Sequence, residues 1–354
     1  MTGKKVFFYV GLPKTGSAFL RQEVFTKLDT SRVCVNPEDV VNVVQKMHAS
    51  HYSPANIDAV KNAAAKAFGN IDQDIVLVTD LDLVGLAVDN FRRFEEITDF
   101  MKELFPEASI IITLRNQVDW LLSLYKHTTT GLDVSITEFL NFSGGKFNSK
   151  QRKDFPNVDA LDFNFAEKCE YYVKAFGKEN VHVLLNEDMV SDPEGLARQI
   201  EGIFGCDMVG NINFRTENKS FSSFGIQITL CKEKLGKLFG REGRQRKEDK
   251  ILHRIISWLE QYDIGNELWR DAIRKKGALY APAILLKRLL LRLRWDHFIR
   301  NVVDRIVYLD WDMLGKERRK ILSRHYSRLN EGLRPYFKNR ETENRYIATA
   351  QAES

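Results

Sequence analysis

Hydrophobic positions in the first 205 residues follow two alternating patterns, short runs rich in β-branched and aromatic residues and longer segments with helical spacing. Most of the short runs are apolar at consecutive positions, which is typical of strands buried on both faces of a parallel sheet. We expect strands at residues 6–10, 33–35, 75–79, 109–114 and 181–185. We expect helices at residues 17–28, 57–68, 91–105, 118–125 and 163–176.

Helices of this length between strands predict crossovers that cover both faces of a parallel sheet, so the fold class is α/β. After Gly205 the strand pattern stops, and the remaining sequence indicates helices and loops. We expect an α/β core over residues 1–235 and a helical, basic C-terminal region over residues 236–354 that packs on the core.

The composition is that of a folded protein and excludes the disordered and collagen-like classes, because the 354 residues are 44% hydrophobic and 29% charged. Its 4 cysteines show no metal-binding spacing and indicate reduced thiols. We expect no cleavable signal before the first predicted strand, and no apolar run reaches the roughly 20 residues that span a bilayer. We therefore expect a cytoplasmic protein.

A glycine-bearing turn, GLPKTGSAFL at residues 11–20, joins the first predicted strand to a helix. Backbone N–H groups of such a turn, together with a helix N-terminus, form a site for phosphate or sulfate. Gly11 and Gly16 have the separation of a nucleotide-triphosphate loop, but Ala18 stands where the Mg²⁺-binding hydroxyl would be, which disfavours a metal–nucleotide site. The lysine, Lys14, lies inside the loop, where it can reach a bound anion.

The segment PKTGSAFL resembles the 5′-phosphosulfate loop of the sulfotransferases that use 3′-phosphoadenylyl sulfate (PAPS). The resemblance implies a P-loop NTPase-like sheet and PAPS as co-substrate, without a metal. It implies that Lys14 binds the bridging oxygen and the sulfuryl group. Backbone and hydroxyl donors to the 5′-phosphate would come from Thr15, Gly16, Ser17, Ala18 and Phe19.

A second segment, RNQVDWLLSLY at residues 115–125, follows another predicted strand and resembles the 3′-phosphate segment of the same family. By position, Arg115 and Ser123 would bind the 3′-phosphate, the guanidinium with two parallel hydrogen bonds. Gln117 stands where the family often has proline, which concerns helix initiation. Open α/β sheets bind ligands beyond the carboxyl ends of their strands, where both segments lie.

Three further segments resemble bacterial and carbohydrate-type members of the family. VHVLLNEDMVSDP at 181–193 looks like a strand followed by the acidic pair Glu187 and Asp188. FRTENKSFS at 214–222 implies that Lys219 and Ser220 contact the adenosine or its 3′-phosphate. Residues 321–337 look like the closing helix.

Sulfuryl transfer to an oxygen requires a base for the acceptor proton. Where relatives carry a glutamate after the strand 75–79, this chain has Leu81, flanked by Asp80 and Asp82. Our first candidate for the base is Asp80. The substitutes are His48, His51 and His127, and the alternative role for Asp80 and Asp82 is capping of a turn.

Net charge divides unevenly, with 26 Lys and Arg against 16 Asp and Glu in residues 241–354, whereas residues 1–240 carry −5. Much of the excess lies in residues 274–300, where 284–295 (ILLKRLLLRLRW) places leucines on one helical face and basic residues on the other. Such a helix suits an anionic membrane surface, although a core-packing helix with a solvated basic face is an equally ordinary interpretation.

The function that we predict is transfer of a sulfuryl group from PAPS to a hydroxyl of a glycan or lipid-linked sugar, at the inner membrane surface if the 274–300 helix binds lipid. One alternative is a P-loop kinase with VLVTD at 76–80 as the Mg²⁺ strand. Another is an inactive membrane-surface adaptor of the same fold. Nucleic acid is disfavoured, because aromatic residues do not interleave with the charges.

Overall fold

The computed structural model describes residues 3–49, 53–128, 134–149, 157–210, 212, 222–238 and 303–347. The chain forms two compact units. The first comprises Met1–Tyr125, Ile136–Lys219 and Leu314–Ser354, and the second comprises Lys126–Ser135 and Ser220–Met313. The predicted boundary between 1–235 and 236–354 stays a prediction, because residues 239–302 lie outside the described part.

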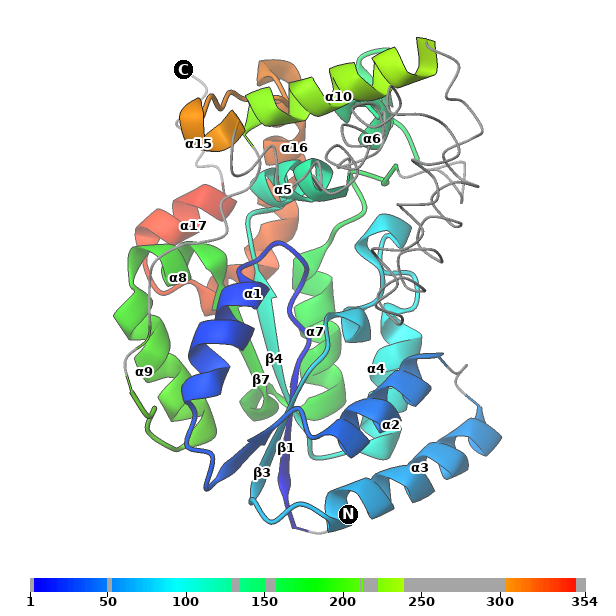
Figure 1. Cartoon of the computed structure of the whole chain (residues 1–354), viewed down its shortest axis with the longest axis vertical. Coiled ribbons are helices and arrows are strands. Elements are labelled where there is room, and N and C mark those ends of the chain that lie inside the picture. The colour runs from blue at the N-terminus through cyan, green and yellow to red at the C-terminus, as the bar shows by residue number, and fades with distance from the viewer. Residues whose placement is uncertain are drawn as a thin grey trace, which may run out of the picture. The chain divides into compact units, whose positions relative to one another are not determined.

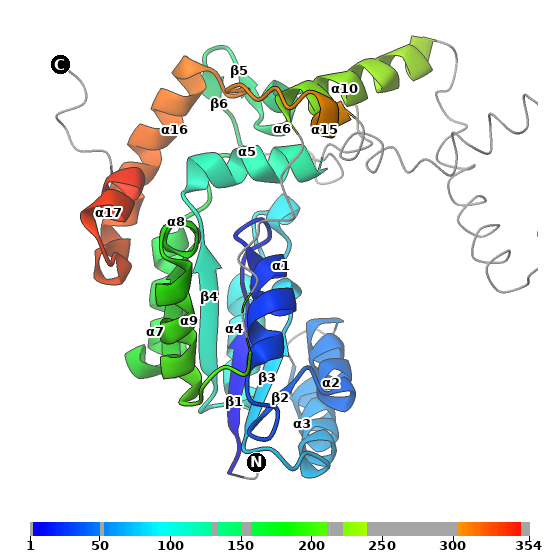
Figure 2. The same ribbon diagram turned by 60° about the vertical axis from the view of Figure 1, so that its left-hand side comes forward.

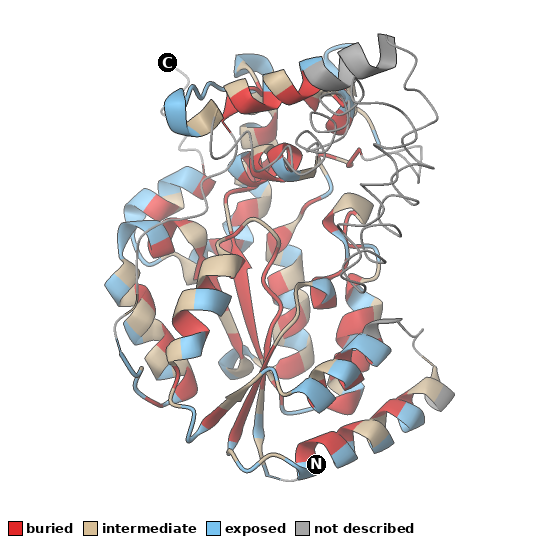
Figure 3. Cartoon of the chain, in the orientation of Figure 1, coloured by how far each residue is buried: buried red, intermediate tan, exposed pale blue. Residues whose placement is uncertain are grey.

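A five-stranded parallel sheet of order β2-β3-β1-β4-β7 organises the first unit (Figure 1). Its strands are β1 (Lys5–Tyr9), β2 (Val33–Val35), β3 (Ile75–Thr79), β4 (Ser109–Leu114) and β7 (Val181–Leu185). Four of them, β1, β3, β4 and β7, are buried over most of their length, and β2 is buried only at Val33 (Figure 3). The α/β fold class and four of the five predicted strand ranges are confirmed, and β1 begins and ends one residue earlier than expected.

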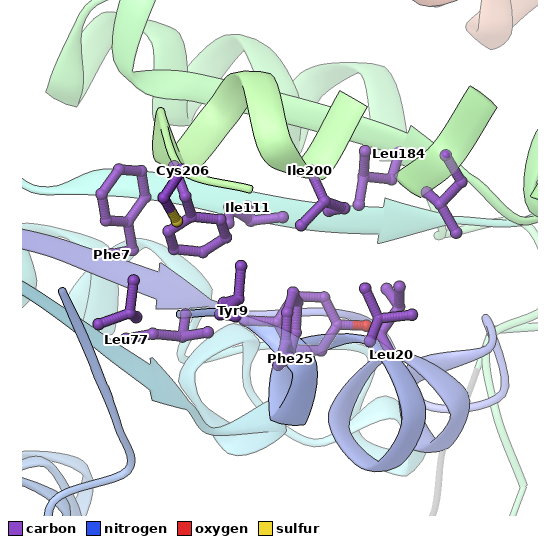
Figure 4. Close-up of a cluster of buried hydrophobic side chains, with 14 of the residues drawn as sticks. Phe7, Tyr9, Leu20, Phe25, Leu77, Ile111, Leu184, Ile200 and Cys206 are labelled. Carbon is purple, nitrogen blue, oxygen red and sulfur yellow. The ribbon is translucent and has the colours of Figure 1, made fainter. Parts of the chain in front are cut away.

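One face of the sheet packs against the segment after β1 and against α9 (Pro193–Phe204). Figure 4 shows this core, in which Phe7, Tyr9 and Ile111 of the sheet meet Phe25 and Ile200 of the covering segments. The segment after β1 consists of a short helix, a π turn and a 3₁₀ turn: α1 (Ser17–Phe19), η1 (Leu20–Val24) and η2 (Phe25–Lys27). The helix expected at 17–28 is therefore irregular after its first turn.

The opposite face carries the crossover helices α3 (Pro54–Gly69), α4 (Phe94–Leu104) and α7 (Phe165–Phe176). Phe8 of β1 packs there on Phe105, with ring centroids 5.1 Å apart. Helix α4 begins three residues later than expected because Asn90 and Phe91 have φ of 53° and 54°. Helix α2 (Glu38–Ala49) and the hairpin of β5 (Phe142–Ser143) and β6 (Lys146–Phe147) are among the elements that were not predicted.

The remaining elements of the first unit are mostly short turns and terminal helices (Figure 2). They are η3 (Leu81–Val84), η4 (Ala87–Asp89), α6 (Ile136–Phe139), η5 (Lys178–Asn180), α8 (Asn186–Ser191), α16 (Lys316–Leu329), η8 (Asn330–Tyr336) and α17 (Arg340–Tyr346). Helix α5 (Gln117–Thr128) follows β4. Leu322 and Tyr326 of α16 are buried, and the Tyr326 hydroxyl donates to the carbonyl oxygen of Ala160. The described C-terminal residues are mainly helical, as predicted, with a non-helical stretch at 307–315.

In the second unit the structure describes α10 (Ser223–Leu238) and α15 (Asp304–Ile306). Acidic side chains hold the start of α10, where the backbone N–H groups of Ser222 and Ser223 donate to Asp304 and Asp310 at 2.9 and 3.0 Å. The ammonium of Lys126 donates to Asp310 at 2.7 Å. Of the helices in the described residues, none is both long enough and apolar enough to cross a membrane.

Candidate functional site

Three predicted site segments leave the sheet at one edge, because β1, β3 and β4 are parallel and their carboxyl ends lie at the same edge. Tyr9, the last residue of β1, is paired with Thr79, the last residue of β3, and with Ile111, after which β4 continues to Leu114. The backbone N–H of Asp80 donates to Tyr9 O at 3.2 Å, which continues the pairing past the strand end. Three parts of the predicted site therefore lie at the carboxyl edge of the sheet, where open α/β folds bind ligands. They are the loop that follows Tyr9, the residue Asp80, and the residue Arg115.

The loop between β1 and α1 has a strained backbone at two positions. Lys14 has φ of 66° and Gly16 has φ of 90°. A left-handed conformation is unusual for lysine, and such strain clusters at functional sites. A Cβ at Gly16 would lie 2.6 Å from Cε of Met189, so glycine is required there by both conformation and space. The positive φ angles of Lys14 and Gly16 therefore set the backbone path of the loop on both sides of Thr15.

Three buried hydroxyl groups, those of Thr15, Thr113 and Tyr9, form a hydrogen-bonded chain between the loop and the sheet. Thr15 is fully buried, and its hydroxyl donates to Leu12 O at 2.6 Å and lies 2.7 Å from Oγ1 of Thr113. Thr113 in turn lies 2.8 Å from the hydroxyl of Tyr9, whose pKa is raised by burial. A Cβ at Gly11 would lie 2.3 Å from the Tyr9 hydroxyl. The Thr15 hydroxyl, expected as a donor to the 5′-phosphate, instead supports the loop, and donation by its backbone N–H stays a prediction.

The loop also contacts the segment that follows β4. The indole N–H of Trp120 donates to Pro13 O at 2.7 Å, and the Arg115 guanidinium donates to Lys14 O at 3.4 Å. The structure therefore brings the predicted 5′ and 3′ segments together. Ser17 is buried, Gly16 and Ala18 are half-buried, and Phe19 packs against the core cluster.

Ser123 on α5 carries a buried hydroxyl that lacks a hydrogen-bond partner among the residues that the structure describes. The residue is 4% exposed. A buried hydroxyl without a partner costs about 1–3 kcal/mol, and a ligand atom or a water that accepts its hydrogen removes this cost. An anionic oxygen, such as that of a 3′-phosphate, fits this donor.

Residues far along the sequence hold the turn that carries Arg115. The Asn116 backbone N–H donates to Oε1 of Glu187 at 2.9 Å, and the Tyr346 hydroxyl donates to Oε2 of the same carboxylate at 2.8 Å. Burial is the main cause that raises the pKa of Glu187, against the lowering effect of these hydrogen bonds and of Arg115. The acidic pair was recognised in the sequence, but its partner Tyr346 was not.

Gln117 is fully buried and forms a reciprocal amide pair with Asn330 of η8. Its Nε2 donates to Oδ1 of Asn330 at 2.7 Å, and Nδ2 of Asn330 donates back to Oε1 at 3.0 Å. The sequence interpretation of Gln117 as a matter of helix initiation missed this contact. The sequence around position 117 could not have predicted this contact, because Asn330 lies more than 200 residues away.

Asp80 caps the turn η3, because its Oδ1 accepts from the backbone N–H of Asp82 at 2.9 Å. Leu81, at the position of the family's glutamate, packs against the core cluster. His127 is exposed and belongs to the second unit, and His48 lies in α2. The structure thus shows a capping role for Asp80, and its part as a base stays a prediction.

Several predicted residues fall outside the described part of the chain, namely Lys219, Ser220, His51 and the segment 274–300. Their predicted roles at the adenosine, as a substitute base and at a membrane are therefore untested by the structure.

Comparison with protein families finds one match, in which residues 7–209 fit the family described as "Sulfotransferase family". The match contains the loop, Arg115, Ser123 and Glu187, and it spans more than half of the 354 residues. The chain belongs to the sulfotransferase family. The enzyme class predicted from the sequence, a PAPS-dependent sulfotransferase, is confirmed, and the kinase alternative is thereby set aside. No curated protein matches this chain.

Solved sulfotransferase structures are similar to part of this chain at low sequence identity. A sulfotransferase from Alicyclobacillus acidocaldarius is 19% identical, with 61% of this chain and 87% of that chain covered and a TM-score of 0.43. The mouse sulfotransferase SULT7A1, crystallised with PAP, is 16% identical, with 58% of this chain and 61% of that chain covered and a TM-score of 0.34. The sulfotransferase domain from the curacin biosynthetic pathway is 12% identical, with 60% and 76% covered and a TM-score of 0.30.

Proposed function

We propose that this sulfotransferase binds PAPS at the carboxyl edge of its sheet and transfers the sulfuryl group to a hydroxyl of a glycan or lipid-linked sugar. The observation that carries the proposal is the buried hydroxyl of Ser123, which lacks a partner in the described structure on the helix that Arg115 precedes. A site that held no anion here would leave this donor unsatisfied at a cost.

On the 5′ side, the strained loop presents its backbone N–H groups and the start of α1 to an anion. Lys14 adds a positive charge within that loop. PAPS, when bound, supplies the sulfuryl group and the phosphate that leaves with the nucleotide. A fixed cation beside these groups stabilises the charge that develops during transfer.

On the 3′ side, the Arg115 guanidinium donates two parallel hydrogen bonds to one phosphate, and the Ser123 hydroxyl donates a third. Arg115 already lies against the loop through Lys14 O, so the two phosphate subsites share a boundary. This contact supports binding of a nucleotide with phosphate groups at both the 5′ and 3′ positions.

For the acceptor proton we retain Asp80 as the first candidate base, with His48, His51 and His127 as substitutes. Asp80 follows β3 directly, at the edge where Lys14 lies. Asp80→Asn keeps an oxygen that can accept from Asp82 N–H, so the cap survives while the base is lost. We expect transfer to fall at unchanged melting temperature, and full turnover in this variant would remove Asp80 from the mechanism.

The glycan or lipid-linked acceptor rests on sequence resemblance and on the basic segment 274–300. Flotation of the protein with liposomes, with and without anionic lipid, tests the membrane part. We expect salt-sensitive binding to anionic liposomes, and equal recovery with both lipid mixtures would contradict it.

Transfer from radiolabelled PAPS to a panel of glycans and lipid-linked sugars tests the whole proposal. We expect a labelled product in at least one acceptor class, and loss of the product in Lys14→Ala. A chain that binds adenosine 3′,5′-bisphosphate but labels no hydroxyl acceptor would instead support the inactive adaptor.

A further inference from the structure

The turn formed by Arg115, Asn116 and Gln117 is tied to the C-terminal residues 330–346 by several buried contacts. Besides the Gln117–Asn330 pair, Nδ2 of Asn116 donates to Arg345 O at 2.6 Å. Nδ2 of Asn330 also donates to Tyr346 O at 3.1 Å. This hydrogen bond joins η8 to α17.

Glu187 links the C-terminal helix to the backbone beside Arg115. One carboxylate oxygen accepts from Asn116 N–H and the other from the Tyr346 hydroxyl. Glu187 is 8% exposed and Tyr346 is 2% exposed, so water competes little for these hydrogen bonds. A carboxylate held from both sides fixes the N–H group that follows Arg115.

Resting on the proposed function, we infer that Tyr346 and Glu187 are positioning residues for the 3′-phosphate. They act through Asn116 on the placement of the Arg115 guanidinium, and they do not contact the nucleotide themselves. The C-terminal segment, which lies beyond the matched family region 7–209, thereby completes the nucleotide site.

A neighbouring contact provides a matched control. Thr342, also on α17 and also buried, donates from Oγ1 to Oδ1 of Asp188 at 2.6 Å. It is one turn away from Tyr346 and pairs with the carboxylate next to Glu187 in sequence, but it has no contact with Asn116 in the described hydrogen bonds. Thr342→Val removes one hydroxyl from the same helix as Tyr346→Phe does, and it leaves the Glu187 link intact.

The test is calorimetric titration of the full chain with adenosine 3′,5′-bisphosphate and with adenosine 5′-phosphate, which lacks the 3′-phosphate. For Tyr346→Phe we expect the affinity for the bisphosphate to fall about three- to tenfold, the worth of one buried hydrogen bond. We expect the affinity for the 5′-phosphate to be unchanged. Thr342→Val should change neither affinity.

Equal loss for both ligands, no loss for either, or the same loss in Thr342→Val would overturn the inference while the proposed function stands. Failure of the unmodified chain to bind the bisphosphate would overturn both. Should Tyr346→Phe fail to fold, Glu187→Asp gives the same test, because it keeps the charge near Arg115 but shortens the reach to both partners. We expect the same loss, confined to the bisphosphate.

Discussion

The loop at residues 11–16 and the turn at residues 115–117 both serve the proposed nucleotide site, yet they are held in different ways. The loop is supported from the sheet strands β1 and β4 and from α5, through the hydroxyl chain from Thr15 to Tyr9 and the indole of Trp120. The turn is supported by Glu187 and by Asn330 and Tyr346, which lie in the C-terminal elements η8 and α17.

Because the loop and the turn are supported differently, we expect substitutions to affect them in different ways. Substitutions in the loop act on the ligand through its own strained backbone and its lysine. Substitutions far from the turn can act on Arg115 without touching a ligand. The loop depends on contacts with the sheet and α5, whereas the turn depends on completion of the C-terminal fold.

The largest effect is expected for Lys14→Gly. Glycine adopts the φ of 66° that strains lysine, so the melting temperature should be equal or higher. Transfer from labelled PAPS should fall by about a hundredfold or more, because the cation beside the transferring group is lost. Melting curves and transfer rates measured together check this, and a destabilised variant with normal transfer would contradict the role of the loop.

Removal of the guanidinium in Arg115→Ala should weaken the affinity for adenosine 3′,5′-bisphosphate by roughly 10- to 100-fold, the range of hydrogen bonds to charged groups. Titration with adenosine 5′-phosphate is the control, and its affinity should change little. A similar loss for both nucleotides would mean that Arg115 serves the loop and not the 3′-phosphate.

Ser123→Ala sharpens the same comparison, because it separates binding from stability. The hydroxyl lacks a partner in the described structure, so its removal should leave the melting temperature unchanged or higher. The affinity for the bisphosphate should fall about tenfold. A marked loss of stability would show that the hydroxyl supports the fold.

The smallest effect concerns the pH dependence of stability in Glu187→Gln. Burial raises the pKa of Glu187, so the folded state holds its proton more tightly than the unfolded state. The contribution of this group is fully present below its ordinary pKa and is lost as pH rises through the raised one. Chemical unfolding between about pH 4 and about pH 7 should therefore show the variant gaining stability relative to the unmodified chain as pH rises. A pH-independent difference would contradict the burial of a charged Glu187.

Local patterns were enough to predict the sheet and the loop. Apolar runs marked the strands, and the glycine spacing around Lys14 marked a turn that the structure shows to be strained. The sequence could not show that the Thr15 hydroxyl points inward, because Tyr9 and Thr113 come from separate strands. It could not reveal Tyr346 or Asn330 either, since their partners are set by packing of the C-terminal helices.

The most direct test of the central claim is the thermal shift of the full chain with adenosine 3′,5′-bisphosphate and, separately, with Mg-ATP. A ligand that binds the native state stabilises it by mass action, so a hundredfold excess over Kd should raise the melting temperature by roughly 5 °C. We expect this rise with the bisphosphate and none with Mg-ATP. A rise with Mg-ATP alone, or no rise with the bisphosphate, would contradict the proposed nucleotide site.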